Sequence, residues 1–167
     1  YPFRRQRQMG IRDSFWIVLA HDRDRPMPGS LPDGVAERLH FIEARGETDL
    51  LWTVEEALRA RPVSLVIAAP EKPISLTAGR RLQLAAEAGG TTGLMLIQEG
   101  RGSSAAETRW KCDPLPSPLD STRHRWILNK NKRGTIGIYD VSWNGTTAAV
   151  HLVPQAGERH QPEGPPR

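Results

Sequence analysis

The sequence has almost no cysteine and no long apolar segment. Cys112 is the only cysteine among the 167 residues, so neither an intrachain disulfide nor a cysteine-based metal centre can form within one chain. This usage fits a reducing cytoplasm, which is where we expect the protein to act. The longest apolar runs, such as Phe15–Ala20 and Leu94–Ile97, are far shorter than the roughly 20 residues of a membrane-spanning helix. We therefore expect no association with a membrane.

Two catalytic motifs are also missing. No glycine in the chain is followed by lysine, so the phosphate-binding P-loop, G-x-x-x-x-G-K-[ST], does not occur. No G-x-S-x-G nucleophile elbow occurs, and Ser103, Ser104 and Cys112 have no assignable His–Asp partner. These absences disfavour a P-loop nucleotide hydrolase and a serine or cysteine hydrolase.

The composition bounds the size and charge of the folded part. A chain of 167 residues is expected to form one domain. Its apolar content of 38% and its mean hydropathy of −0.51 are low for a compact enzyme. We expect a disordered basic arm over 1–13, a folded domain over 14–153 and a disordered tail over 154–167. The net charge of +4 and the pI of about 9.7 are compatible with a nucleic acid or an acidic partner without selecting either.

The first two thirds of the chain alternate between strand-like and helix-like segments. Thr48 is the expected N-cap of the first helix, Ser75 or Thr77 caps the second, and Gly89-Gly90 ends it. Short connections between alternating elements predict a parallel sheet with right-handed crossovers. The expected strands span 15–20, 39–43, 63–68 and 93–98, and the expected helices span 48–60 and about 76–88.

The last third of the chain is strand-like with tight connections. Pro114, Pro116 and Pro118 predict a stiff linker inside this region, and Asn144-Gly145 is a strong hairpin signal. The expected strands span 108–112, 125–130, 135–143 and 146–153. The predicted fold class is therefore α/β, with a mainly parallel sheet flanked by helices and followed by antiparallel C-terminal strands.

Two loops carry candidate ligand-binding residues. Gly100–Ala105 fits G-x-G-x-x-[GA], but a dinucleotide site also needs a helix at that turn, and the strand expected over 108–112 follows too soon. We interpret this segment as a flexible loop. His21, Asp22 and Asp24 could supply metal ligands at the carboxyl edge of the sheet, although adjacent loop residues of alternating charge are more often solvated. We expect neither a metal nor a cofactor.

A cationic cluster lies in the strand-like region. Strand geometry places Lys130 and Lys132 on one face if the strand extends that far. Such a pair suits a phosphate-bearing ligand or an acidic neighbour, and it equally suits a solvated edge where lysines deter sheet-to-sheet pairing. Trp110, Trp126 and Trp143 could stack on bases, although a tryptophan in a strand more often belongs to the core. The cluster comprises Arg123, His124, Arg125, Lys130, Lys132 and Arg133.

A series of segments carries a family pattern. Residues 76–96, LTAGRRLQLAAEAGGTTGLML, combine a helix rich in Arg, Leu and Ala with a Gly-Gly break and an apolar strand. Residues 44–68 form a preceding helix–strand unit, and residues 107–117 and 125–143 form later strands. From about residue 15 to residue 153 this series resembles the ImuA family of bacterial DNA-damage proteins, which are relatives of the RecA recombinase core.

The resemblance implies a fold, a process and partners. The fold would be that of the RecA-like ATPases, and the process would be error-prone translesion synthesis induced by DNA damage. The implied partners are RecA, an inactive Y-family polymerase homologue (ImuB) and an error-prone DNA polymerase.

The chain departs from the family pattern at the positions that would bind and hydrolyse a nucleoside triphosphate. It starts beyond the first core strand, phosphate loop and following helix of family members, so we expect a fragment or a shortened form. Residues 63–70, VSLVIAAP, correspond to the strand that carries the acidic metal-organising residue in active recombinases, and Ala69 stands near that position. Without that carboxylate and the P-loop lysine and hydroxyl, nothing would hold magnesium or stabilise a transferring phosphoryl group. We expect a protein that is not an enzyme.

Two further correspondences concern ligand contacts. The DNA-contacting loops of recombinases would fall within 70–75 and 99–106, both short, and Arg101 is the only cation of the second. Lys130-Asn131-Lys132 resembles a recombinase segment that faces the nucleotide of an adjacent subunit, which implies an interface role.

The sequence thus predicts a non-catalytic, RecA-like accessory protein of translesion synthesis that acts by protein–protein contacts. One alternative is a DNA-binding module that uses the basic segment 123–133. Another is a nucleotide-binding enzyme that uses His21, Asp22, Asp24 and the loop at Gly100. The candidate contact residues are Arg101, Arg123, Arg125, Lys130, Lys132 and Arg133.

Overall fold

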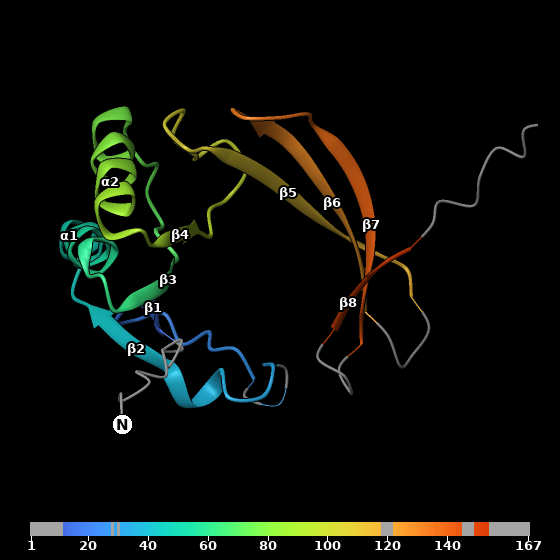
Figure 1. The fold of residues 1–167 in the computed structure, drawn as a ribbon, viewed down its shortest axis with the longest axis horizontal. Coiled ribbons are helices and arrows are strands. Elements are labelled where there is room, and N and C mark those ends of the chain that lie inside the picture. Colours follow the sequence, from blue (N-terminus) through green and yellow to red (C-terminus); the bar gives the residue numbers. More distant parts are fainter. Residues whose placement is uncertain (1–11, 28, 30, 118–121, 145–148, 154–167) are drawn as a thin grey trace, which may run out of the picture. The chain divides into compact units, whose positions relative to one another are not determined.

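The computed structural model describes residues 12–27, 29, 31–117, 122–144 and 149–153 (Figure 1). The tail predicted over 154–167 and nearly all of the arm predicted over 1–13 lie outside these residues. By its internal contacts the chain divides into two compact units, Tyr1–Ala106 (unit 1) and Glu107–Arg167 (unit 2). The prediction of one domain over 14–153 did not distinguish these units.

Unit 1 contains a four-stranded parallel sheet, as the alternating pattern predicted. The strand order is β2-β1-β3-β4, and every neighbouring pair is parallel. The apolar run of β1 lies at the centre, with Ile17 opposite both Ile42 and Ala68. The elements are β1 (Asp13–Leu19), η2 (Ala36–Arg38), β2 (Leu39–Ala44), α1 (Glu47–Arg59), β3 (Val63–Ala68), α2 (Leu76–Gly89) and β4 (Thr92–Met95).

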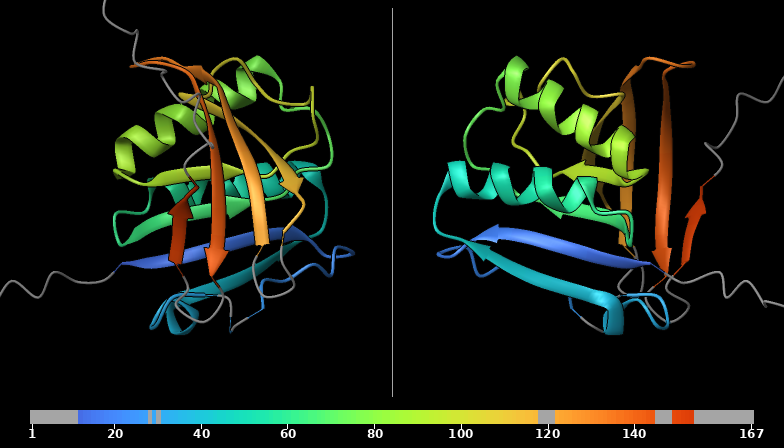
Figure 2. Two further views of the ribbon diagram at one scale, coloured as in Figure 1. Left: turned by 90° about the vertical axis from the view of Figure 1, so that its right-hand side faces the viewer. Right: turned by 60° about the vertical axis from the view of Figure 1, so that its left-hand side comes forward.

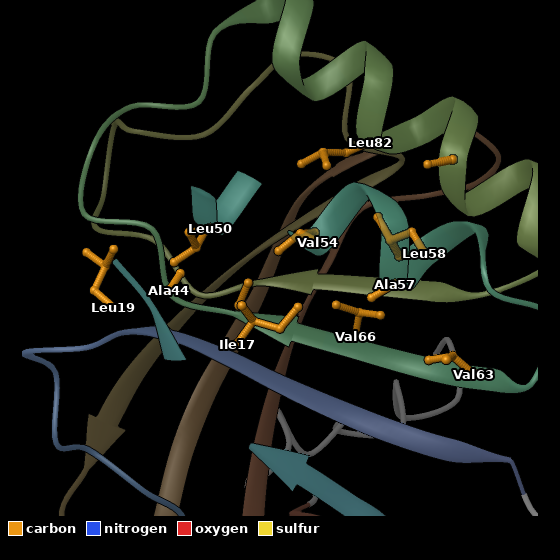
Figure 3. Packing of buried hydrophobic residues seen from close by; sticks show 12 residues of the cluster. Ile17, Leu19, Ala44, Leu50, Val54, Ala57, Leu58, Val63, Val66 and Leu82 are labelled. Carbon is orange, nitrogen blue, oxygen red and sulfur yellow. The ribbon is translucent and has the colours of Figure 1, made fainter. Parts of the chain in front are cut away.

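The core of unit 1 lies between the sheet and its two helices. Both helices cover the same face of the sheet, as right-handed connections from β2 to β3 and from β3 to β4 require (Figure 2). The most deeply buried side chains come from both layers, and each buried Ile, Leu or Val contributes about 1.5–3 kcal/mol by leaving water. The cluster includes Ile17, Leu19, Ala44, Leu50, Val54, Ala57, Leu58, Val63, Val66, Ala68, Leu82 and Ala85 (Figure 3).

Side-chain and backbone caps fix the helix ends. Ser75 is the N-cap of α2, and its Oγ accepts a hydrogen bond of 3.1 Å from the amide of Ala78. Gly90 ends α2 in the left-handed conformation with φ of 65°, as the Gly-Gly signal predicted. The prediction of Thr48 as the cap of α1 is wrong, because α1 begins at Glu47 after the extended residue Gly46.

In its described part, unit 2 is an antiparallel sheet, as predicted, with four strands in the order β5-β6-β7-β8. Its strands are β5 (Thr108–Leu115), β6 (Thr122–Asn131), β7 (Gly137–Asn144) and β8 (Ala149–Leu152). Asn144 lies opposite Ala149, so β7 and β8 form the expected hairpin, and Gly145 lies outside the described residues.

The predicted proline linker is wrong at its first position. Pro114 belongs to β5 and lies opposite His124 of β6. β5 is an edge strand of the sheet, so a residue without an amide hydrogen is tolerated there. Pro116 follows the end of the strand, and Pro118 lies outside the described residues.

The two faces of the sheet in unit 2 differ in chemistry. Residues directly opposite each other share a face, so Cys112, Trp126 and Tyr139 lie on one side. Trp110 lies on the same face, with its ring 6.2 Å from that of Trp126 and 5.9 Å from that of Tyr139 between centroids. The opposite face carries charged side chains, including the aligned series Asp113, Arg125 and Asp140.

Candidate functional site

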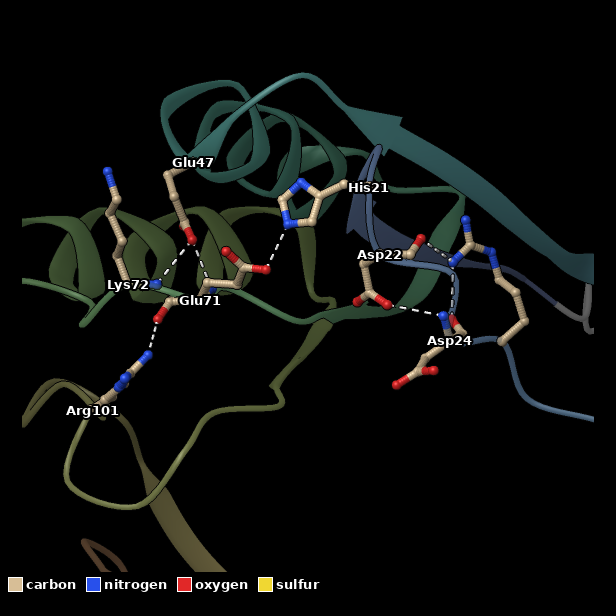
Figure 4. A network of polar contacts seen from close by, with 8 residues as sticks. His21, Asp22, Asp24, Glu47, Glu71, Lys72 and Arg101 are labelled. Carbon is tan, nitrogen blue, oxygen red and sulfur yellow. Dashed lines mark hydrogen bonds and ion pairs between the residues drawn. The ribbon is translucent and has the colours of Figure 1, made fainter.

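The carboxyl edge of the parallel sheet in unit 1 gathers charged residues from four separate segments. His21 follows β1, Glu47 opens α1 after β2, Glu71 follows β3, and Arg101 lies in the loop after β4 (Figure 4). The carboxyl ends of parallel strands meet at one edge, which explains why residues distant in sequence meet here. We call these four residues the edge network.

Glu71 is at the centre of the edge network. Its carboxylate Oε1 lies 2.7 Å from Nε2 of His21, and its main-chain oxygen accepts a hydrogen bond from Arg101. Glu47 Oε1 accepts hydrogen bonds from the backbone amides of Glu71 and Lys72, at 2.7 and 2.9 Å. The network therefore ties the segment after β3 to the N-terminus of α1 and to the loop after β4.

The ion pair with Glu71 changes the titration of His21. The hydrogen bond and the negative charge of Glu71 raise the pKa of the imidazole above its ordinary 6.5, and Asp22 and Glu47 add to the effect. Both partners are mostly exposed, with 67% and 59% of the side chains accessible. The pair is therefore a hydrated link between segments rather than a buried catalytic dyad.

The candidate metal ligands after β1 are engaged locally. Asp22 Oδ1 accepts a hydrogen bond of 2.9 Å from the amide of Asp24. Arg25 donates to the main-chain oxygens of both aspartates, bonds to Glu43 at 3.1 Å and lies over the ring of Phe41. His21 pairs with Glu71 rather than with either aspartate. Within the described residues, no three His, Cys, Asp or Glu side chains are grouped so that they could hold a metal ion.

The corner after β3 is apolar, as its sequence requires. Ala68 is fully buried, Pro70 is buried, and the amide of Ala69 donates to the carbonyl of Ile17 at 3.3 Å. Ala69 thus continues the contact between β3 and β1, and it carries no group that could bind a cation.

The glycine-rich segment after β4 forms a loop rather than the start of a helix. Gly100 has φ of 81°, and no helix occurs between β4 and β5, where every residue is described. A Cβ added to Gly79 of α2 would lie 2.2 Å from Ser103 Oγ, so the loop packs closely on α2. Arg101 uses its guanidinium to hold Glu71, and its carbonyl accepts a bond of 3.2 Å from Ile74.

The other candidate contact residues lie in unit 2, and two arginines occupy the charged face of β6. Arg125 makes a two-pronged ion pair with Asp140, at 2.7 and 2.9 Å. The hydrogen bond and charge of Arg125 lower the pKa of Asp140 below its ordinary 3.8, and Asp140 raises the pKa of Arg125. Nε of Arg123 is buried with no hydrogen-bond acceptor among the described residues.

The lysines lie at the end of β6. Lys130 lies opposite Arg109 of β5. The shared strand face predicted for Lys130 and Lys132 required the strand to reach residue 132, and β6 ends at Asn131, so this condition is not met. The Asn131 side chain accepts from the amide of Arg133 and donates to the carbonyl of Thr135, both at 3.1 Å, within the connection from β6 to β7.

Acidic residues already engage part of the cationic cluster. Glu107 pairs with Lys132 at 3.3 Å and with Arg133 at 3.4 Å. Arg123 and Arg125 lie on the face of the sheet opposite to Trp126. A single strand of nucleic acid could use cations and aromatic rings together only if they lay on the same face of the sheet. The arginines of β6 lie on the other face from the aromatic rings and do not meet this condition.

Sequence reasoning missed a buried carboxylate between the helices. Glu55 of α1 has a side chain only 6% exposed, and it pairs with Arg59 and, at 2.7 Å, with Arg81 of α2. The spacing from Glu55 to Arg59 was a readable i, i+4 signal, but the partner on α2 depends on how the helices pack.

Burial and the neighbouring Asp113 raise the pKa of the Cys112 thiol, which weakens it as a nucleophile.

The fold and the edge network define a mixed α/β protein whose charged residues at the sheet edge are largely paired with one another. None of the helices in the described part of the chain is long and apolar enough to cross a membrane. No family model matches the chain. The chain is similar to Protein ImuA of Caulobacter vibrioides, in strains NA1000 and ATCC 19089, with 38% identity over 113 residues in each comparison. The match covers 60% of this chain and 46% of the length of each relative, so the chain spans about half of those proteins.

Proposed function

We propose that the chain acts in DNA-damage-induced mutagenesis as a cytoplasmic, RecA-like accessory protein of error-prone translesion synthesis. The observation that carries this proposal is the match to Protein ImuA, at 38% identity over 113 residues. The segments that resemble the ImuA family, residues 44–68 and 76–96, form α1–β3 and α2–β4, which are consecutive units of the parallel sheet.

The proposed mechanism is protein–protein contact without nucleotide hydrolysis. Ala68, Ala69 and Pro70 offer no carboxylate at the corner after β3, and the nearby charges of Glu47 and Glu71 are engaged within the edge network. These features support a sheet that serves as a scaffold. The proposed partners are RecA, an ImuB-like polymerase homologue and an error-prone polymerase, and the proposed contact surface includes Lys130 and Lys132.

A bacterial strain that lacks the gene tests this role. After ultraviolet damage, we expect fewer rifampicin-resistant mutants in the deletion strain, and we expect the wild-type gene to restore them. The double variant Lys130→Gln/Lys132→Gln should restore them poorly and should recover less RecA or polymerase subunit in a pull-down. Arg45→Gln/Arg61→Gln removes the same charge from unit 1 and serves as the control. Unchanged mutagenesis in the deletion strain, with neither partner recovered, would refute the proposal.

The two alternatives remain predictions with their own measurements. A DNA-binding module would lose affinity steeply with salt, and Lys130→Gln/Lys132→Gln would reduce that slope. A nucleotide-binding enzyme would gain thermal stability with ATP or NAD at about 1 mM.

A further inference from the structure

β8 is an edge strand of the antiparallel sheet in unit 2. It pairs with β7 on one side, and no strand of the described residues pairs with its other side (Figure 1). The amide of Val153 donates to the carbonyl of Asp140 at 2.8 Å. Hydrogen-bonded positions alternate along an antiparallel strand, so Val150 and Leu152 direct their own N–H and C=O groups away from β7. The outer edge of β8 therefore presents backbone donors and acceptors to a further strand.

The two edges of this sheet differ in how they are protected. At the other edge, β5 carries Pro114, which has no amide hydrogen, and the ion pair of Lys111 with Asp113. Proline and charged side chains are common means by which proteins prevent pairing at a sheet edge. β8 (Ala149–Leu152) contains neither proline nor Asp, Glu, Lys or Arg. The edge at β8 is thus open to a further strand, over a short length.

An antiparallel pair of β8 strands is self-complementary. If two copies pair about a two-fold axis at His151, Val150 of each copy lies opposite Leu152 of the other, and the outward backbone groups of these residues bond reciprocally. Directly opposite residues share a face, so each Val150 side chain meets a Leu152 side chain. These side chains are 48% and 68% exposed, and both lie on the face of Trp126 and Tyr139.

We propose that β8 pairs with β8 of a second copy of the chain, which joins the two antiparallel sheets into one. A second copy matches this edge because its own Val150 and Leu152 supply the donors, the acceptors and the apolar side chains at the required spacing. The contact involves neither Lys130 nor Lys132 and does not depend on the proposed role in mutagenesis.

Sedimentation of the full chain over a range of concentrations tests the proposal. We expect a monomer–dimer equilibrium with a Kd below about 1 mM, since a contact of four residues per copy forms a weak interface. Leu152→Lys and Val150→Glu should each raise the Kd about tenfold or more, because each places a charge against an apolar side chain of the second copy. An equimolar mixture of the two variants should associate again, because the introduced ammonium then lies opposite the introduced carboxylate.

Ile138→Lys is the matched control. It also replaces an exposed apolar side chain of this sheet by lysine, but Ile138 belongs to β7, which has a strand on both sides. This variant should dimerise like wild type. Val150 and Leu152 are largely exposed, so their variants should keep the thermal midpoint of the wild-type protein.

A cysteine at the two-fold axis provides a second measurement. Residues at the position of His151 would face each other in a non-hydrogen-bonded pair, with about 4.5 Å between Cα atoms, which a disulfide can bridge. Under mild oxidation, His151→Cys should therefore form a covalent dimer. Wild type, which has only Cys112, and Ile138→Cys should remain largely uncrosslinked under the same conditions.

Each outcome decides the question. Weaker association of both single variants, recovery in their mixture and crosslinking confined to His151→Cys support the proposal. A wild-type chain that stays monomeric near 1 mM, about the weakest affinity allowed above, overturns it. Failure of the mixture to associate, or failure of His151→Cys to crosslink, also overturns it. Equal weakening by Ile138→Lys would assign the contact to another surface and would overturn it as well.

Discussion

Glu55 contributes to the contact between α1 and α2 through a charge that the helix pair nearly encloses. Its carboxylate is buried, but the side chains of Arg59 and Arg81 are 51% and 62% exposed. Water can solvate both guanidinium groups if the carboxylate is neutralised, so no buried charge would be left without a partner. The cost of losing Glu55 is therefore smaller than that of breaking a fully buried ion pair.

We expect Glu55→Gln to lower the free energy of unfolding by about 1–2 kcal/mol, after discounting for the exposed partners. Glu56→Gln is the matched control, because Glu56 is exposed and, among the described residues, pairs only with Arg59 of the same helix, so it should cost about 0–0.5 kcal/mol. Urea unfolding of the three proteins measures the difference. Equal midpoints for both variants would contradict the role assigned to Glu55.

His21 gives unit 1 a pH-dependent link. Because Glu71 raises the pKa of His21, the folded state favours the protonated imidazole. The link is fully present below pH 6.5, the ordinary value, and is lost as the pH rises through the higher folded value. In an NMR titration, the midpoint of His21 should fall toward 6.5 in Glu71→Gln and stay in place in Asp24→Asn. A midpoint that does not move in Glu71→Gln would show that the pair does not form in solution.

At the scale of elements, the apolar runs predicted most of the fold. The strand predicted over 63–68 matches β3, and the strand predicted over 15–20 overlaps β1, because both runs are bounded by residues that favour loops. The failures depend on partners that a single segment does not reveal. Pro114 is tolerated within β5 because β5 is at the edge of its sheet, and β6 ends at Asn131, whose side chain bonds within the turn that follows.

The edge network was less accessible to sequence reasoning for the same reason. His21 was singled out by its place after an apolar strand, but its partner Glu71 is 50 residues away. Only the strand order β1-β3, set by tertiary packing, brings the two segments together. Arg101 was identified as an isolated loop cation, whereas the structure uses it to hold the main chain at Glu71.

The helix pair depends on the absence of a side chain at Gly89. A Cβ at this position would lie 2.0 Å from the carbonyl oxygen of Leu58, which is backbone and cannot rotate away. We expect Gly89→Ala to cost about 2–3 kcal/mol, because one of the helices must shift. Gly46→Ala, at the extended N-cap position of α1 with open space around it, should cost less, about 0.5–1 kcal/mol, because an N-cap favours glycine over alanine. Thermal and urea unfolding measure the stability of both variants. Equal stability of the two would contradict the role assigned to Gly89.

At the scale of the whole molecule, the two units bury apolar surface very unequally. The hydrophobic cluster between sheet and helices belongs to unit 1. In the described part of unit 2, the buried apolar side chains are Leu128 and Val141, while Trp110 and Leu152 remain 43% and 68% exposed. A single antiparallel layer gains little stability from burial on its own, so the stability of the chain should be concentrated in β1, β3 and the helices.

Native-state hydrogen exchange on the full chain measures this distribution. Amides of β1 and β3, such as those of Ile17 and Val66, should exchange only through global unfolding, which has the highest opening free energy. Amides of β6 and β7, such as that of Trp126, should open at a free energy lower by at least about 1 kcal/mol, because fewer buried contacts oppose their separation. The amide of Leu58 in α1 is an internal control that should follow β1, since its side chain belongs to the same cluster. Uniform protection across the two sheets would mean that unit 2 is stabilised as strongly as unit 1, and the assignment of stability to the cluster around Ile17 would then be wrong.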